Sequence, residues 1–195
     1  MKLVRLFALA FMAIALARCG RLPQPAVDAV RAALDAAVKA EAPVYAAEAF
    51  AKAHALVTSM DAELAAQAAK SAVGRSYAHA AALAAEAAEA AKQASEAAAG
   101  GKEQVRAEVA RMVPDVAKAL DDAAARIGQA AAVRGIKLDV SQLRAEVEAG
   151  RKALQDAGSD ATAAKFMDAR NKLQAITDLL SAAAKTVDEA TKAPK

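Results

Sequence analysis

The sequence contains very few of the side chains from which β-sheets, nucleic-acid surfaces and disulfide frameworks are built. It has no Trp, two Tyr, four Phe, two His and a single Cys among 195 residues. Strands favour aromatic and β-branched residues, and stacking platforms for nucleic acids need aromatic residues interleaved with basic ones, so we expect neither. One Cys alone excludes an internal disulfide.

What the chain has in abundance is alanine, which makes up roughly a third of its residues. Alanine has the highest intrinsic helix propensity and loses no side-chain entropy on folding. We therefore predict an all-α fold, an elongated antiparallel helical bundle of two αα-hairpins with coiled-coil-like, Ala-rich packing. A buried methyl group gains only about 0.8 kcal/mol, so the contacts between these helices should be thin.

The formal charge of +3 has its origin at the amino terminus. Residues 1–18 hold Lys2, Arg5 and Arg18 and no acidic residue, so without them 26 − 3 = 23 basic residues face 23 acidic ones. A neutral chain lacks the excess of basic residues through which counterion release drives binding to nucleic acid. We expect no nucleic-acid partner.

The amino terminus has the pattern of an export signal. Lys2 and Arg5 precede an uninterrupted apolar run over 6–17, which is typical of a signal peptide and too short to cross a bilayer as a helix. We predict a signal peptide over 1–18.

The segment Leu16-Ala17-Arg18-Cys19 resembles the lipobox of bacterial lipoproteins, in which the Cys becomes the first mature residue and is acylated. Arg18 departs from the pattern, because the residue before the Cys is normally small. Ala15 and Ala17 also fit the small-x-small rule of ordinary signal peptidase, which would release a soluble periplasmic protein. We predict lipid attachment at Cys19, since an unpaired thiol in an oxidising compartment otherwise lacks a role.

The resemblance to lipoproteins also implies a location. Gly20 follows the Cys where Asp would retain a lipoprotein in the inner membrane. It implies sorting to the outer membrane of a Gram-negative cell, on the periplasmic side, with acyl chains as the contact with the membrane.

Proline and glycine residues divide the rest of the chain into a lipidated amino terminus and tether over 19–25, a first helical region over 26–99 and a second over 102–192. The pair Gly100-Gly101 is the clearest break. Apolar residues at helical spacing predict these buried seams: Val27, Val30, Leu34 and Val38; Ala46, Phe50, Ala53, Val57, Met60 and Leu64; Leu83, Ala84, Ala87 and Ala91; Val105, Val109, Met112, Val116, Leu120 and Ile127; Val140, Leu143, Val147 and Leu154; and Phe166, Ala169, Leu173, Ile176, Leu180, Ala183 and Val187.

Helix ends follow from caps and breakers. We expect helices to end at Gly74, Gly135 and Gly158, and Pro114 to kink or split the helix that contains it. We expect helices to begin with Pro43 in a first turn, with a cap at Ser76, with a capping box of Asp139 and Gln142, and at Ser159 or Asp160. Acid-before-base pairs four residues apart should support the outer faces, namely Glu48/Lys52, Asp122/Arg126, Glu148/Lys152 and Asp168/Lys172.

No constellation of residues indicates catalysis, a metal or a cofactor. His54 and His79 lack a carboxylate or Cys four residues away that would complete a metal set, and we interpret them as surface or seam residues. The neighbouring Asp121 and Asp122 point to different sides of a helix, which favours a solvated face over acid-base catalysis. We predict a protein that is not an enzyme.

The start of the chain and its first half together resemble a known family. The lipobox-like start, the segment Ala42-Pro43-Val44-Tyr45-Ala46, the segment Gly74-Arg75-Ser76-Tyr77 and the alanines after it are similar to an alanine-rich helical bacterial lipoprotein family known as a domain of unknown function. The resemblance covers about residues 15–100. It implies an envelope location and helical hairpins, and no catalytic residues.

The leading functional hypothesis is a lipid-anchored structural or interaction module, whose helical seams pair with protein partners or with a second copy. One alternative is a covalent peptidoglycan tether through the C-terminal Lys195, motivated by the lipobox and the Ala-rich seams. Another is a soluble periplasmic carrier of an apolar ligand between loosely packed helices.

Overall fold

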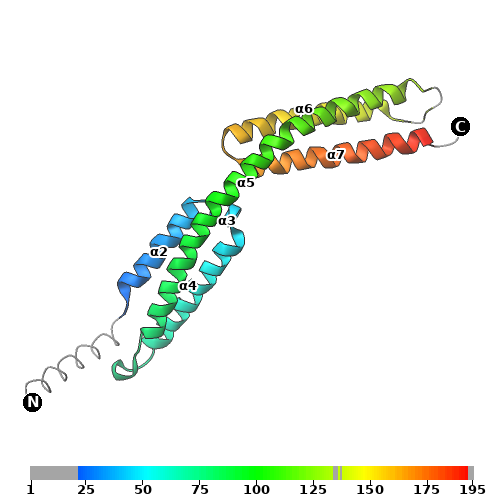
Figure 1. Cartoon of the computed structure of the whole chain (residues 1–195). Coiled ribbons are helices and arrows are strands. Elements are labelled where there is room, and N and C mark those ends of the chain that lie inside the picture. Colours follow the sequence, from blue (N-terminus) through cyan, green and yellow to red (C-terminus); the bar gives the residue numbers. More distant parts are fainter. Residues whose placement is uncertain (1–21, 134–135, 137, 193–195) are drawn as a thin grey trace, which may run out of the picture. The chain divides into compact units, whose positions relative to one another are not determined.

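The computed structural model describes residues 22–133, 136 and 138–192, and these residues form helices and turns with no strand among them. The elements are α2 (Gln24–Lys39), α3 (Ala42–Tyr45), α4 (Ala47–Ala68), the 3-10 turn η1 (Ala72–Gly74), α5 (Ala78–Ala131), α6 (Val140–Thr162) and α7 (Phe166–Lys192) (Figure 1). The prediction of an all-α helical bundle is confirmed.

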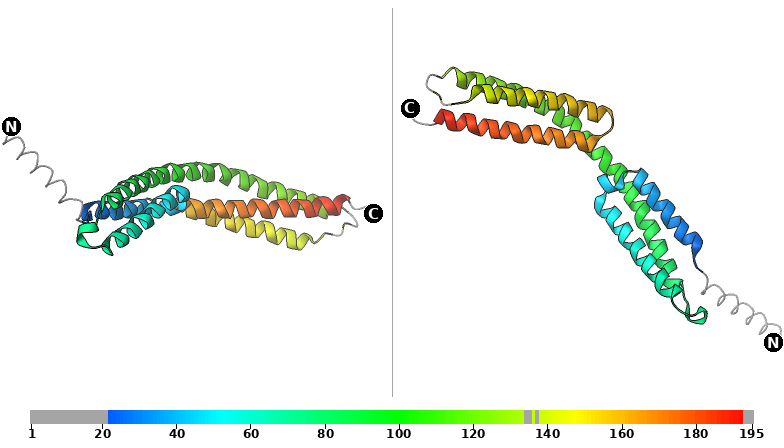
Figure 2. Two further views of the ribbon diagram at one scale, coloured as in Figure 1. Left: turned by 90° about the horizontal axis from the view of Figure 1, so that it is seen from below. Right: turned by 180° about the vertical axis from the view of Figure 1, so that it is seen from behind.

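The chain divides into two compact units, residues 1–101 and 102–195, and the division falls inside α5. In the first unit α2, α4 and the first part of α5 pack together, with α3 at the corner between α2 and α4 (Figures 1 and 2). In the second unit the rest of α5 packs with α6 and α7. Each unit therefore adds a third helical segment to the hairpin expected from the sequence.

The cores of the two units differ in the size of their side chains. In the first unit most buried residues are alanines, such as Ala53, Ala87 and Ala94, with Met60 as the largest fully buried side chain. The core of the second unit is built mainly from Val, Leu and Ile, including Leu120 and Leu173. Small side chains bring helix axes close but remove little apolar area from water, so we expect the first unit to gain less hydrophobic stabilisation per residue.

The predicted seams are largely confirmed. The six seam residues of α7 from Ala169 to Val187 are buried, as are Ala84, Ala87 and Ala91 in α5. The prediction that Val38 belongs to a buried seam is wrong, because Val38 is 52% exposed while its neighbour Ala37 is fully buried. An Ala at the packed position lets the last turn of α2 approach α5, and this excludes the larger Val from the contact.

The division between the two units falls at Gly101, as the predicted boundary between the helical regions implies. The expected helix break at Gly100-Gly101 is wrong, however, and so is a split caused by Pro114, since α5 continues through all three residues. A glycine in a helix costs about 1 kcal/mol relative to Ala and a proline about 3. Burial on both sides of these positions offsets that cost, because Ala98 before them and Val109 and Val116 around the proline are packed in cores.

Several other helix ends are shifted for identifiable reasons. The tether is shorter than predicted, because Pro25 lies in the first turn of α2, where a missing N–H costs nothing. Gly158 lies inside α6, which ends at Thr162, and the turn before α7 contains Ala164 at φ 59°. Similarly, Glu41 at φ 60° separates α2 from α3. Non-glycine residues in this left-handed region are uncommon, so these turns give no sequence signal.

Candidate functional site

The predicted lipid-attachment residue, Cys19, lies outside the described residues, as do Lys195 and Gly135. The first described residue is Leu22, and α2 begins two residues later at Gln24. In the sequence two residues, Gly20 and Arg21, separate Cys19 from Leu22.

The connection between α4 and α5, hereafter the 69–77 turn, is held by its own side chains. Arg75 donates from Nε to the carbonyl oxygen of Lys70 (2.8 Å) and from Nη2 to that of Ala68 (3.1 Å). Carbonyl groups at the end of a helix have no partner within the helix. The Arg75 guanidinium therefore closes the C-terminus of α4.

A buried glutamine supports the same turn from inside. Gln67 is 6% exposed, and its Oε1 accepts the backbone N–H of Ser76 at 3.0 Å. Its Nε2 donates to Glu63 at 2.7 Å, which satisfies both ends of the amide. Ser76 is therefore not the predicted helix cap, because α5 begins at Ala78 and the Ser76 backbone is bound to Gln67. Sequence reasoning missed both Gln67 and Arg75, since their partners are set by the course of the turn.

The two histidines do not form a site. His54 and His79 are exposed, and the ring of His54 lies against that of Phe50, at 6.4 Å between ring centroids. Within the described residues no three His, Cys, Asp or Glu side chains lie close enough together to hold a metal ion. None of the described helices combines the length with the apolar character that a membrane-spanning segment needs.

A shallow apolar hollow lies between α5 and α7 in the second unit. Its volume is about 110 Å³, and its lining is mainly apolar, consisting of Ala119, Asp122, Ala123, Arg126, Ile127, Leu180, Ala183, Ala184 and Val187. Pockets for small molecules usually measure about 300–1,000 Å³. A more open hollow of about 290 Å³ is bordered by Asp121 and Arg151, a charged pair that an apolar ligand would have to desolvate. Neither supports the hypothesis of an apolar-ligand carrier.

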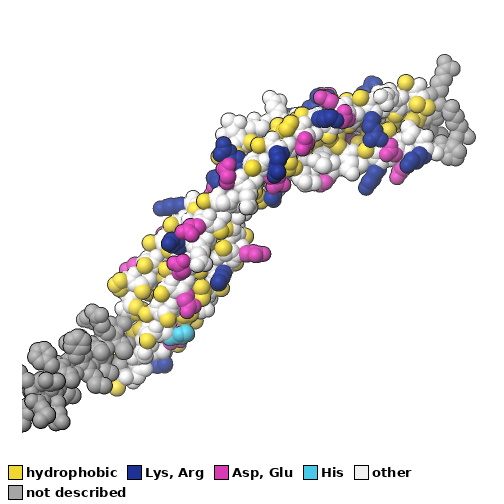
Figure 3. Space-filling model, in the orientation of Figure 1, with side chains coloured by type: hydrophobic (Ala, Val, Ile, Leu, Met, Phe, Trp, Pro, Cys, Tyr) yellow, Lys and Arg dark blue, Asp and Glu magenta, His cyan; other side chains and the backbone are white. Residues whose placement is uncertain are grey.

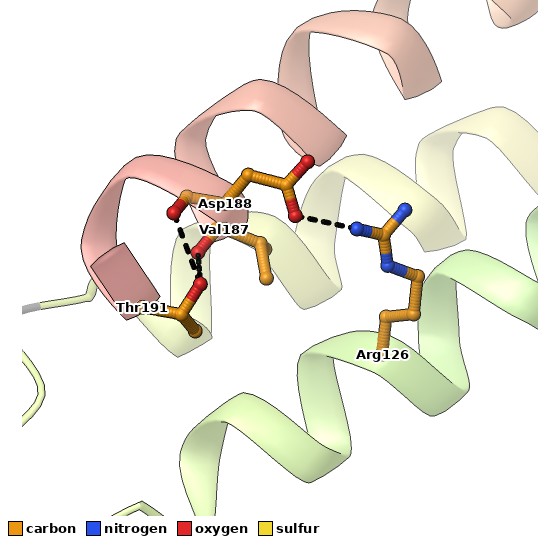
Figure 4. A network of polar contacts seen from close by, with 4 residues as sticks. All are labelled: Arg126, Val187, Asp188 and Thr191. Atoms are coloured by element: carbon orange, nitrogen blue, oxygen red, sulfur yellow. Dashed lines mark hydrogen bonds and ion pairs between the residues drawn. The ribbon is translucent and has the colours of Figure 1, made fainter.

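Some ion pairs on the second unit join different helices, whereas others, such as Lys118–Asp122, join neighbouring turns of one helix. Arg126, which the sequence pairs with Asp122, instead binds Asp188 of α7 at 2.6 Å (Figure 4). Lys172 binds Asp160 of α6 at 2.5 Å rather than Asp168. The Arg126–Asp188 pair is about half exposed, and such pairs contribute roughly 0–1 kcal/mol, so this pair orients α7 more than it stabilises the unit.

Hydrogen bonds shift the pKa of three groups in the second unit. The pKa of Lys118 is raised chiefly by its hydrogen bond to Asp122, and that of Lys172 by its hydrogen bond to Asp160. The pKa of Asp139 is lowered, mainly because its carboxylate accepts the backbone N–H of Gln142 at 2.9 Å. This bond confirms Asp139 as the cap of α6.

Only half of the predicted capping box forms. The side chain of Gln142 does not return to the Asp139 backbone but donates to Glu146 at 2.9 Å. On the face shown in Figure 3, basic and acidic side chains of the second unit are intermixed rather than gathered into a patch of one sign. These are the features of a solvated helical surface.

Comparison of the chain with protein-family models, with curated proteins and with solved structures gives no match. The resemblance to an alanine-rich lipoprotein family therefore stays a prediction from the residues quoted above. Cys19, which precedes the start of α2 in the sequence, accordingly remains the candidate site as a prediction.

Proposed function

We propose that the chain is a non-enzymatic, lipid-anchored protein of the cell envelope. Cys19 carries the acyl chains, the outer membrane holds the protein on its periplasmic side, and the helical units act as a structural or interaction module. The observation that carries the proposal is the order of features at the amino terminus, a basic start and an apolar run followed directly by Leu16-Ala17-Arg18-Cys19.

Two further observations support it. No described helix is a candidate membrane span, and the proposal assigns attachment to the acyl chains. The described helices begin at Gln24, five residues after Cys19, as in a domain held close to its anchor. Several acyl chains, at about 0.8 kcal/mol per buried CH₂, make such attachment long-lived.

The test is metabolic labelling of the full chain with a radioactive or clickable fatty acid. The proposal predicts label on the wild type, none on Cys19→Ala, and accumulation of the precursor in that variant and after treatment with globomycin, an inhibitor of lipoprotein signal peptidase. Arg18→Ala is the matched control, because it restores a small residue before the Cys. It should be processed at least as fast as the wild type.

An unlabelled wild type whose mature form begins at Arg18 would refute the anchor and support a soluble periplasmic protein. The remaining alternative, a peptidoglycan tether, predicts muropeptides joined to the side chain of Lys195. No contact of the described residues favours it, and our proposal predicts that none will be found.

A further inference from the structure

One end of the first unit combines the entry of the chain with the 69–77 turn. Val27 near the start of α2 packs in one cluster with Ala84 near the start of α5, and Ala37 near the end of α2 packs with Ala98 further along α5. The two helices therefore run in the same direction, and α4, which lies between them in the chain, runs in the opposite direction. The start of α2 and the 69–77 turn lie at the same end (Figures 1 and 2). We call residues 22–25 and 69–79 the proximal end.

The proximal end exposes apolar side chains. Val73 is 99% exposed and Leu22 is 48% exposed. Single exposed apolar residues are common on protein surfaces, but the exposure of Val73 is built into the turn. Arg75 binds two carbonyl groups of the turn and Gln67 binds its last part, and the N–H of Gly74 donates to Ser71 across Val73. The hydrogen bonds of the turn thus hold the valine outward.

Within the proximal end itself the charged side chains are basic, although two carboxylates border it, Asp28 bound to Gln24 and Glu63 bound to Gln67. The stretch from Leu64 to Ala85 contains no Asp or Glu, although it contains Lys70, Arg75 and His79. Lys70 is exposed and Arg75 is partly exposed. An exposed apolar tip with basic neighbours complements the interface of a phospholipid membrane, where acyl chains lie beneath phosphate groups.

We propose that the proximal end contacts the phospholipid surface. Val73 enters the headgroup layer, Lys70 lies near lipid phosphates, and the 69–77 turn acts as a second contact beside the acyl chains of Cys19. The inference rests on the proposed anchor, since the short segment between Cys19 and Leu22 places this end, rather than the opposite end of the unit, at the membrane. The contact would set the orientation of the first unit on the surface.

Because the chain contains no Trp, one substitution introduces a single fluorescent reporter. Val73→Trp places it on the 69–77 turn. Val44→Trp is the matched control, because Val44 is also an exposed valine, at 51%, and lies in α3 at the opposite end of the first unit. Each full-length variant is expressed, purified from membranes and reconstituted into vesicles of phosphatidylethanolamine and phosphatidylglycerol, with and without brominated acyl chains.

We expect emission of the Trp at position 73 to shift to shorter wavelength on reconstitution and to be quenched by brominated lipid roughly twofold or more, while the control is unchanged. Adding Lys70→Glu to Val73→Trp should reduce the quenching in phosphatidylglycerol vesicles. The inference is overturned if the protein sediments with the vesicles but the emission and quenching of the Trp at position 73 match those of the control. That result leaves the anchor intact.

The failure of the anchor is separate from the failure of this contact. If cells do not acylate Cys19, the variants will not be recovered from membranes. In that case the exported protein is purified and the free thiol of its Cys19 is coupled to a maleimide phospholipid in the same vesicles. Quenching at position 73 in the coupled protein supports the contact, and its absence again overturns it.

Discussion

Gly100 and Gly101 are neighbours in α5, yet an added methyl group should have opposite effects at the two positions. A Cβ at Gly100 meets no atom within 4 Å. A Cβ at Gly101 would lie closer than 3.0 Å to the carbonyl oxygen of Tyr45 and 3.3 Å from its carbonyl carbon. These are backbone atoms at the end of α3, which cannot rotate aside as a side chain can.

The size of the effect follows from two contributions. Replacing a helical Gly by Ala stabilises by about 0.5–1 kcal/mol, and this gain is common to both variants. Overpacking costs about 1–3 kcal/mol, and this cost applies only to Gly101→Ala, which must move α3 away from α5. The difference in the free energy of unfolding between the two variants therefore isolates the contact, at about 1–3 kcal/mol.

The assay is urea unfolding of the two variants and the wild type, followed by circular dichroism at 222 nm. We expect a higher midpoint than the wild type for Gly100→Ala and a lower one for Gly101→Ala. Gly128→Ala tests the shared gain in the second unit, because its Cβ also meets nothing within 4 Å. Equal midpoints for Gly100→Ala and Gly101→Ala would refute the close approach of α3 to α5.

Two further predictions concern the second unit. Leu173→Ala removes a fully buried side chain and should lower the free energy of unfolding by about 2–5 kcal/mol. The control Val133→Ala changes a residue that is 46% exposed and should alter the free energy of unfolding by less than about 0.5 kcal/mol. Equal losses for the two variants in urea unfolding would contradict the packing of the core. Asp139→Ala should reduce the thermal midpoint at pH 7. Because hydrogen bonds lower the pKa of Asp139 in the folded state, its contribution is present above the pKa of the unfolded chain, about 3.9, and is lost as pH falls through the lower folded value. The midpoints of wild type and Asp139→Ala should therefore converge in acid, and a constant gap down to pH 2 would argue against the cap.

The sequence by itself determined the helical class, the inward faces and the cap at Asp139. Alanine content favours helix over strand locally, and apolar residues recur at a period that depends only on helix geometry. Seam residues such as Ala169 and Leu173 could therefore be identified without knowing which helix covers them. The cap at Asp139 was equally predictable, because an Asp side chain reaches a backbone N–H three residues ahead whatever the rest of the fold.

Only the tertiary structure decided where the helices end and which polar partners meet. The cost of Gly100 and Gly101 in a helix is small beside the burial on either side, so α5 continues, and the need for a glycine at position 101 becomes visible only when Tyr45 lies against it. The partner of Arg126 is Asp188, 62 residues away, and the 69–77 turn depends on Gln67 and Arg75 meeting its backbone. Contacts between residues distant in the chain leave no periodic signal, because their geometry exists only after the helices have packed.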